Sequence, residues 1–288
     1  MQRISFTNAR GTVISFDNFP PYYLWKIDRT GLPEVTTIKT QTVGQSGYTF
    51  HGNLFESREV KVTGHVFGRA GLEAFYGFRR RLNDVLNPLL GPGELVYQNS
   101  YGVWKIPAFA NAAPYEDRIG PSQTLNIIFE CPSPFWRSME ASIASLAYIY
   151  GGLRFPVRLP NRFGAFGYQA FIDNGSDVET PIEMTIDGGS SNPIIINETT
   201  GDFIKLAKHV NVGEQLFINT DTENLEVSLI YVDPATNGRV RENAYGYLTN
   251  DSRLFRLARG LNRLRFMSDD ENRNVRITIR FYKLYVGV

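Results

Sequence analysis

The stretch Phe129-Glu130-Cys131-Pro132-Ser133-Pro134-Phe135-Trp136, near the midpoint of the chain, divides the sequence into two parts. Before it, residues 123–129 alternate between polar and apolar side chains, as a strand does. The two prolines lack the N–H groups that a central strand donates, so the strand must end here. The residue before each proline is restricted to extended geometry. We therefore expect a stiff segment that Phe135 and Trp136 anchor on a neighbouring surface.

The length of the chain indicates two domains. At 288 residues it is about twice the usual domain size. We expect an N-terminal domain over residues 1–134, a linker over 135–153 and a C-terminal domain over 154–288. The 26 glycines and the 13% aromatic content favour sheets with many turns. The predicted fold class is mainly β, with two domains.

Charge and cysteine content exclude several classes of site. A net charge of +1 gives no reason to expect a nucleic-acid ligand or an acidic membrane surface. Cys131 is the one cysteine, which excludes an intrachain disulfide, and a buried side chain is favoured over a reactive thiol. The N-terminus lacks the apolar run of a secretory signal, and Ile143–Tyr150 is too short to span a bilayer. We expect a protein that is soluble.

The first half contains one convincing helical pattern, over residues 69–86, which Asn87-Pro88 ends. Before it, residues 58–67 alternate as a strand with one solvated side. Residues 44–54 have the composition of an exposed loop or hairpin tip. The turn Gly91-Pro92-Gly93 leads into two further short strands.

The elements of the first half follow in the order strand, helix, Asn87-Pro88, residues 91–97, second strand and residues 130–136. This order resembles that of the distal tail proteins of long-tailed bacteriophages. The resemblance implies a homo-oligomeric ring, expected to be a hexamer, at the tip of the tail tube. It also implies contact with the tail tube protein and docking of the tail fibre, the tail-associated lysin and other baseplate proteins. The expected location is the virion tail tip, after assembly in the host cytoplasm, and no cofactor or membrane is implied.

The second half is predicted to be a β-sandwich, because strand patterns follow one another from residue 168 at intervals of about ten residues. After residue 232 the expected strands are residues 254–258, 261–267 and 275–285. Its turns, from Asn174-Gly175 to Gly213-Glu214, also resemble the C-terminal domain of distal tail proteins, which is similar in architecture to galectins and carbohydrate-binding modules. Residues 137–150 are compatible with a short helix or with an extended segment.

Glycan binding through this second domain is the alternative function. Galectin-type binding needs a tryptophan platform, and the sequence has no tryptophan between Pro160 and Val288. The best remaining platform consists of Tyr231, Tyr245 and Tyr247, for which a packing role is favoured. We expect no measurable sugar affinity in the free domain.

No pattern of a catalytic or metal site stands out in the sequence. Motifs of hydrolases, nucleotide-binding loops and zinc sites are missing, and no histidine has a second ligand at a useful spacing. The carboxylates of Glu116-Asp117 and Asp269-Asp270-Glu271 lie in turn-like contexts. An enzyme, with a hydrolase as the third hypothesis, is therefore not expected.

Two features of the first half exceed what its fold needs and are candidates for the ring interface. The run Arg79, Arg80 and Arg81 is more cationic than a helix end requires. The segment 44–53, with Gln45, Ser46 and Tyr48, is a polar projection that could reach over a neighbouring subunit. The alternative is a solvated helix end and a mobile loop.

Overall fold

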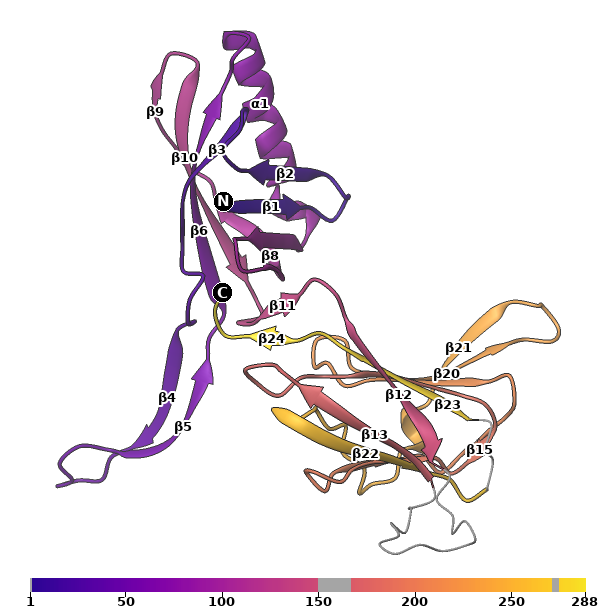
Figure 1. Cartoon of the computed structure of the whole chain (residues 1–288). Helices are drawn as coiled ribbons and strands as arrows, with labels where there is room; N and C mark the ends of the chain where they lie inside the picture. Colours follow the sequence, from indigo (N-terminus) through magenta and orange to yellow (C-terminus); the bar gives the residue numbers. More distant parts are fainter. Residues whose placement is uncertain (1, 150–166, 271–274) are drawn as a thin grey trace, which may run out of the picture. The chain divides into compact units, whose positions relative to one another are not determined.

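The computed structural model describes residues 2–149, 167–270 and 275–288, and its chain divides into two compact units (Figure 1). Unit 1 consists of Met1–Met139 and Tyr285–Val288, and unit 2 consists of Glu140–Leu284. The sequence places its first domain limit at residue 134, whereas unit 1 continues to Met139 and takes in the end of the chain. The mainly β fold class is confirmed.

Unit 1 is built on a sheet with the strand order β2-β1-β7-β8-β10-β6-β3, with which β9, β11 and β24 also pair. A separate antiparallel hairpin consists of β4 and β5. The bounds are β1 Arg3–Thr7, β2 Val13–Phe16, β3 Tyr22–Asp28, β4 Val35–Thr40, β5 Thr49–Phe55, β6 Arg58–Phe67, β7 Gly93–Gln98, β8 Val103–Ala112, β9 Tyr115–Ile119, β10 Ser122–Cys131, β11 Trp136–Ser138 and β24 Leu284–Tyr285.

The centre of unit 1 is the antiparallel pair β6 and β10, which stays in register from Arg58↔Cys131 to Phe67↔Ser122. Along β6, buried and half-buried residues alternate strictly, as the sequence predicts. The face that carries Val60 and Val62 belongs to one apolar core, together with the buried face of β10. If either strand shifted by one residue, its apolar side chains would point away from the core. Burial of these side chains therefore fixes the register.

The helix α1 (Leu72–Val85) buries Phe75, Leu82 and Val85 in the same core. It begins later than the predicted start at residue 69, because Gly71 before it has φ 110°, a backbone conformation outside the helical range that glycine tolerates. The short helix η1 (Pro88–Leu90) follows, and the Asn87 side-chain oxygen accepts the Leu89 N–H at 3.0 Å. The predicted stop at Asn87-Pro88 agrees with this end of α1.

The proline-containing stretch after β10 stays within unit 1. Trp136 is 0% exposed in the core and opens β11, which pairs with β8. Phe135 packs edge-on against Phe55, with 5.5 Å between ring centroids. The strand ends at Cys131, as expected, and the residues that follow belong to unit 1 as far as Met139, held there by Phe135 and Trp136.

Unit 2 contains a sheet with the strand order β17-β16-β22-β13-β12-β23-β14-β19-β20-β21. Unit 2 also contains a separate antiparallel pair, β15 with β18, and the short helix η2. The bounds are β12 Ser142–Ile149, β13 Gly167–Asn174, β14 Glu183–Asp187, β15 Ser190–Ser191, β16 Ile194–Asn197, β17 Phe203–Lys205, β18 His209–Val210, β19 Gln215–Asn219, β20 Glu226–Val232, β21 Arg239–Asn243, η2 Tyr245–Tyr247, β22 Gly260–Met267 and β23 Arg276–Phe281.

The strand β12 joins the two halves of this sheet. Its residues 142–146 pair with β23, and its residues 147–149 pair with β13. Buried residues of both halves, among them Leu264 on β22 and Met184 on β14, belong to one core cluster. A sheet that encloses one core from two sides has the sandwich arrangement that the strand spacing predicts.

Several predicted elements of unit 2 differ in the structure. Residues 254–258 form no strand; they contribute only the bridge between Leu257 and Thr180. The strand β21 lies between residues 232 and 254, where the sequence predicts no strand. Residues 142–149 are strand, which agrees with the extended alternative for residues 137–150. The continuous strand predicted over residues 275–285 is divided into β23 and β24.

The last residues of the chain return to unit 1. The Val288 N–H donates to the Thr30 carbonyl at 3.1 Å, and the Tyr285 ring lies edge-on to Trp104, with centroids 6.4 Å apart. The two units are therefore joined by two stretches of chain, at residues 139–140 and at residues 284–285.

Cleavage of one connection is expected to leave both fragments associated. If a protease recognition site is inserted between Met139 and Glu140, at the limit between the two units, the C-terminal fragment keeps Tyr285–Val288, whose contacts lie within unit 1. After cleavage, gel filtration should give one peak, and denaturing electrophoresis should give two bands. The same cleavage in a chain that ends at Leu284 should give two peaks. Separation of the full-length fragments in native buffer would contradict this expectation.

Candidate interaction surfaces

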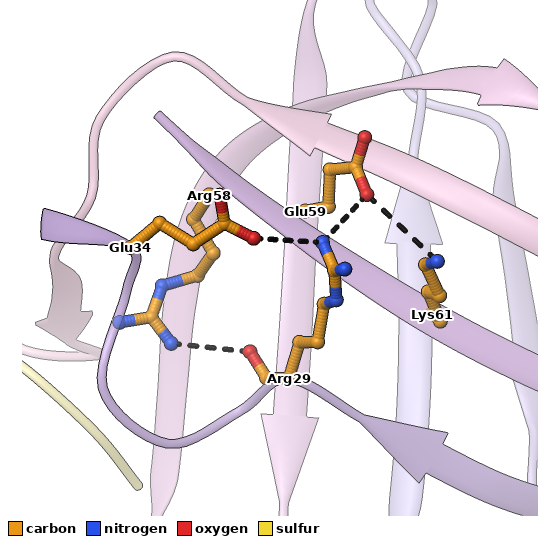
Figure 2. Close-up of polar contacts among 5 residues, drawn as sticks. All are labelled: Arg29, Glu34, Arg58, Glu59 and Lys61. Atoms are coloured by element: carbon orange, nitrogen blue, oxygen red, sulfur yellow. Dashed lines mark hydrogen bonds and ion pairs between the residues drawn. The ribbon is translucent and has the colours of Figure 1, made fainter. Parts of the chain in front are cut away.

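A buried arginine organises the end of unit 1 from which the β4–β5 hairpin projects. Arg58, the first residue of β6, is 2% exposed. Its guanidinium donates to five backbone carbonyls: Gly31 at 2.6 Å, Thr30 at 3.0 Å, Arg29 at 3.3 Å, Pro134 at 2.9 Å and Val286 at 2.5 Å. One side chain thus ties together the loop after β3, the proline-containing stretch and the end of the chain. Figure 2 shows its hydrogen bond to the Arg29 carbonyl.

Burial shifts the pKa values of two groups beside this cage in opposite directions. Removal from water lowers the pKa of Arg58 to about 10, because it disfavours the charged guanidinium. The same effect raises the pKa of the Cys131 thiol to about 12, since it disfavours the thiolate. Cys131 is therefore a protonated core residue at neutral pH, which agrees with the reading of it as a buried side chain.

Raising the pH from 9 to 10 is expected to destabilise unit 1 by about 1 kcal/mol through Cys131. In the unfolded chain the thiol loses its proton near its ordinary value of 9.0, whereas the folded thiol keeps its proton to about pH 12. The stabilisation is complete below pH 9 and is lost as the pH rises. The three tryptophans all lie in unit 1, so urea unfolding followed by tryptophan fluorescence measures it. Cys131→Ala should flatten the pH dependence; an unchanged slope would contradict it.

The β4–β5 hairpin exposes apolar side chains on both of its faces. Val35 and Phe55 form one cross-strand pair and are 41% and 39% exposed, whereas Leu54, in the next pair, is 57% exposed. Successive residues of a strand point to opposite faces. Beyond the strands, Val43 at the tip is fully exposed. The loop or hairpin tip expected at residues 44–54 is the outer part of this hairpin.

The predicted interface residues of the tip have different surroundings. Gln45 braces the turn: its side-chain oxygen accepts the Thr42 N–H at 3.1 Å, and its amide lies 3.2 Å from Thr49 Oγ1. Ser46 is exposed. Tyr48 is 53% exposed, and the Lys39 ammonium lies 4.9 Å from the centre of its ring. Gln45 is thus used within the hairpin, whereas Ser46 and much of Tyr48 face outward.

The three predicted arginines of α1 likewise separate into two groups. The Arg79 guanidinium stacks over Tyr115 at 4.1 Å from the ring centre and is half-buried. Arg80 and Arg81 are exposed and form no ion pair within the residues that the structure describes. A change at Arg79 would perturb the packing of unit 1, so only Arg80 and Arg81 present a free cationic surface.

The three predicted platform tyrosines of unit 2 form no open aromatic face. Tyr245 and Tyr247 are half-buried in η2 and pack against the core. The Lys208 ammonium lies 4.5 Å above the Tyr247 ring, and the Tyr247 hydroxyl donates to Glu242 at 3.3 Å. Tyr231 is on β20, and its pKa is raised by partial removal from water, then by the charge of Glu242 and a hydrogen bond to that carboxylate. Glu242 thus brings Tyr231 and Tyr247 together, with a lysine over one of the rings.

The turn carboxylates are used in local hydrogen bonds. Asp270 accepts the Ser191 N–H at 3.0 Å, and Asp269 accepts the Asn192 side-chain amide at 2.6 Å. Glu116 accepts the Asn126 side-chain amide in a short hydrogen bond. Over residues 2–149, 167–270 and 275–288, no group of histidine, cysteine and acidic residues is arranged to hold a metal ion. In the same residues, no helix is long and apolar enough to cross a membrane.

Two family models match successive parts of the chain. A phage tail protein RIFT-related domain matches residues 9–131. The C-terminal domain of siphovirus-type tail components matches residues 175–285. A comparison with curated proteins finds no match.

Solved structures share the fold over the whole chain. The crystal structure of the phage protein SPP1 Dit, titled a paradigm of hub adsorption apparatus in Gram-positive infecting phages, has a TM-score of 0.69 at 11% identity, covering 99% of each chain. A chain of the phage P2 baseplate in its activated conformation with Ca has a TM-score of 0.59 at 13% identity, covering 100% of this chain and 99% of that one. At these identities the similarity establishes the fold alone.

The motifs that suggest a tail protein in the sequence lie inside the matched regions. The helix stop at Asn87-Pro88 lies within the first match, and the turn at Asn174-Gly175 lies at the start of the second. Because these two matches to tail proteins together span most of the sequence, the chain belongs to the siphovirus-type distal tail proteins and is a structural component of the virion tail tip.

Proposed function

We propose that unit 1 assembles into a ring of six copies at the distal end of the tail tube, and that this ring is the hub on which the tail fibre, the tail-associated lysin and other baseplate proteins dock. Membership of the distal tail family supports this proposal. So does the fold, which is shared with a protein whose title describes a hub adsorption apparatus.

The observation that carries the proposal is the exposed apolar surface of the β4–β5 hairpin. A two-stranded hairpin is at best marginally stable in water, and this one leaves Ile38, Phe50 and Leu54 at 45%, 58% and 57% exposure. Concentrated apolar exposure of this kind marks protein interaction surfaces. Contact with a neighbouring subunit would remove these side chains from water and stabilise the hairpin.

The first test is the mass of the purified protein in solution, followed by electron microscopy. We expect rings, with a mass near six times the 32.6 kDa of the chain. A protein that stays monomeric at every concentration and shows no rings would overturn the proposal.

The second test uses matched pairs of substitutions. Phe50→Ser with Leu54→Ser removes apolar side chains from the hairpin and should prevent ring formation. Phe171→Ser with Leu261→Ser makes the same change in unit 2, where both side chains are 62% exposed, and should leave rings intact. Rings that survive the hairpin substitutions would remove the hairpin from the interface.

The hub role is tested separately. Purified rings are mixed with the tail-associated lysin or the fibre protein of the same phage, and gel filtration should show one co-migrating complex. Rings that form but bind neither protein would overturn the hub role while leaving the ring assignment in place.

A further inference from the structure

A cleft at the base of the β4–β5 hairpin is rich in carboxylates. It has a volume of about 700 Å³, and its walls include Glu34, Glu56 and Glu59; Figure 2 shows Glu34 and Glu59 on either side of Arg29. Arg29 pairs with Glu59 at 2.8 Å and more weakly with Glu34 at 3.5 Å. The Glu34 side chain remains 77% exposed, and Glu56 is exposed without an ion pair within the described residues. The Lys61 ammonium also lies 4.0 Å from Glu59, so Glu34 and Glu56 are the carboxylates of the cleft that have no close ion pair in the described residues.

One face of the hairpin continues this cleft as an apolar surface. The ladder extends to Glu34 and Glu56, since the Glu56 N–H donates to the Glu34 carbonyl at 2.9 Å. Side chains two residues apart share a face, so Leu54 and Ile38 lie beyond the two carboxylates on the same side. Four residues of strand separate Ile38 from Glu34, about 13 Å. This face is therefore acidic at its base and apolar farther out.

The exposed side of α1 carries the complementary series. Leu72, Tyr76 and Arg80 follow at intervals of four, which places them in one stripe along the helix. Leu72 is 51% and Tyr76 50% exposed, and Arg81 lies beside Arg80. From Leu72 to Arg80 the helix rises about 12 Å. The stripe is thus apolar and then cationic over nearly the same length as the hairpin face.

The two surfaces cannot meet within one copy. The strand β6 begins at Arg58 beside the cleft and ends at Phe67, five residues before α1 begins. Its ten residues span about 30 Å, so the hairpin and the helix lie at opposite ends of unit 1 (Figure 1). Two different surfaces at opposite ends of one subunit are what a closed head-to-tail ring requires.

We infer that α1 of a second copy of this chain lies along the hairpin face, with its Arg80 and Arg81 on Glu34 and Glu56 and its Leu72 and Tyr76 against Ile38 and Leu54. This inference rests on the proposed ring and names the contact that closes it. Pairing of two arginines with two carboxylates fixes the register of the helix on the hairpin, while the apolar contacts remove surface from water.

Charge reversal on each side tests the pairing. Arg80→Glu with Arg81→Glu, or Glu34→Arg with Glu56→Arg, should each weaken ring formation about tenfold or more, because like charges then face each other. The four substitutions in one chain reverse both surfaces together and should restore rings. An equimolar mixture of the two double variants should also form rings, with the variants alternating. Measurement is by sedimentation and electron microscopy of the full-length chain.

A matched control separates this contact from a general effect of charge. Arg253→Glu with Arg259→Glu makes the same change in net charge on the surface of unit 2 and should leave rings unaltered. If either double variant still forms rings as the wild type does, the proposed contact is wrong. The same holds if the combined variant does not recover the rings. Both outcomes leave the ring assignment in place. A wild-type protein that forms no rings would overturn the proposed function together with this contact.

Discussion

Replacing Arg58 by methionine is expected to lower the free energy of unfolding of unit 1 by about 3 kcal/mol or more. Methionine fills much of the same volume but has no N–H groups. The carbonyls of Gly31, Thr30, Pro134 and Val286 would lose the donor that now lies 2.5–3.0 Å away. These hydrogen bonds are part-buried, and an acceptor that is left without a partner away from water costs about 1–3 kcal/mol.

Removal of the buried charge in Arg58→Met also contributes favourably to the stability of unit 1. Burial of the guanidinium is costly, as its lowered pKa indicates, and an apolar replacement of a buried charge is sometimes neutral or stabilising. That happens when both partners of an ion pair are replaced. Here the acceptors are backbone carbonyls, which remain after the substitution, so we expect a net loss.

Tryptophan fluorescence during urea unfolding measures this effect, since Trp25, Trp104 and Trp136 all belong to unit 1. Arg58→Lys keeps a charge but lacks the planar fork, so an intermediate loss is expected. Arg10→Ala, an exposed arginine of the same unit, should cost less than about 0.5 kcal/mol. An unchanged unfolding midpoint for Arg58→Met would show that the carbonyls find other donors.

Replacing Asn174 by alanine is expected to destabilise unit 2 by about 2–3 kcal/mol. Asn174 is 0% exposed, and its amide donates to the carbonyls of Leu257 at 3.1 Å and Ala258 at 3.2 Å. Its oxygen accepts the Ser176 hydroxyl at 2.5 Å, and Ser176 Oγ in turn accepts the Leu284 N–H at 3.0 Å. Alanine would leave several of these buried polar groups without a partner.

Hydrogen exchange of the β13 and β22 amides reports the stability of unit 2, which contains no tryptophan. Exchange there should accelerate, whereas the tryptophan-detected unfolding of unit 1 should change by less than about 0.5 kcal/mol. Asn224→Ala, at an exposed position of unit 2, is the control and should change neither measurement. Equal exchange rates in Asn174→Ala and the control would contradict a structural role for this side chain.

The sequence predicts elements whose causes are local. The alternation along residues 58–67 gives β6, and the spacing of apolar residues gives α1, because burial of one face decides both. The same alternation places Arg58 on the face of Val60 and Val62, so its burial could have been predicted from its position. A charged residue at a core position is the signal that was missed.

Other features depend on contacts between distant parts of the chain. Arg58 and Val286 are 228 positions apart, and nothing in the alternation of residues 275–285 indicates that the strand divides and its end enters unit 1. In the same way, three consecutive arginines look alike in the sequence. They differ in the structure because Tyr115, on β9, lies where only Arg79 can stack on it.

The hairpin shows why an interaction surface is only partly predictable. Composition identifies residues 44–54 as exposed, which the structure confirms. The strand β5 begins inside this segment at Thr49, because backbone pairing with β4 extends it beyond what its side chains suggest. The apolar series on one face becomes visible only when the cross-strand register is known.

The double connection between the units bears on how a tail tip carries mechanical load. Tension on unit 2 would pass into unit 1 along two paths, the covalent chain through Met139 and the C-terminal segment that begins at Tyr285. The C-terminal segment is held in unit 1 by the Arg58–Val286 hydrogen bond at 2.5 Å, by the Val288–Thr30 hydrogen bond at 3.1 Å and by the Tyr285 ring against Trp104, so force on it is divided among several contacts. If these contacts break, the chain through Met139 still joins the units.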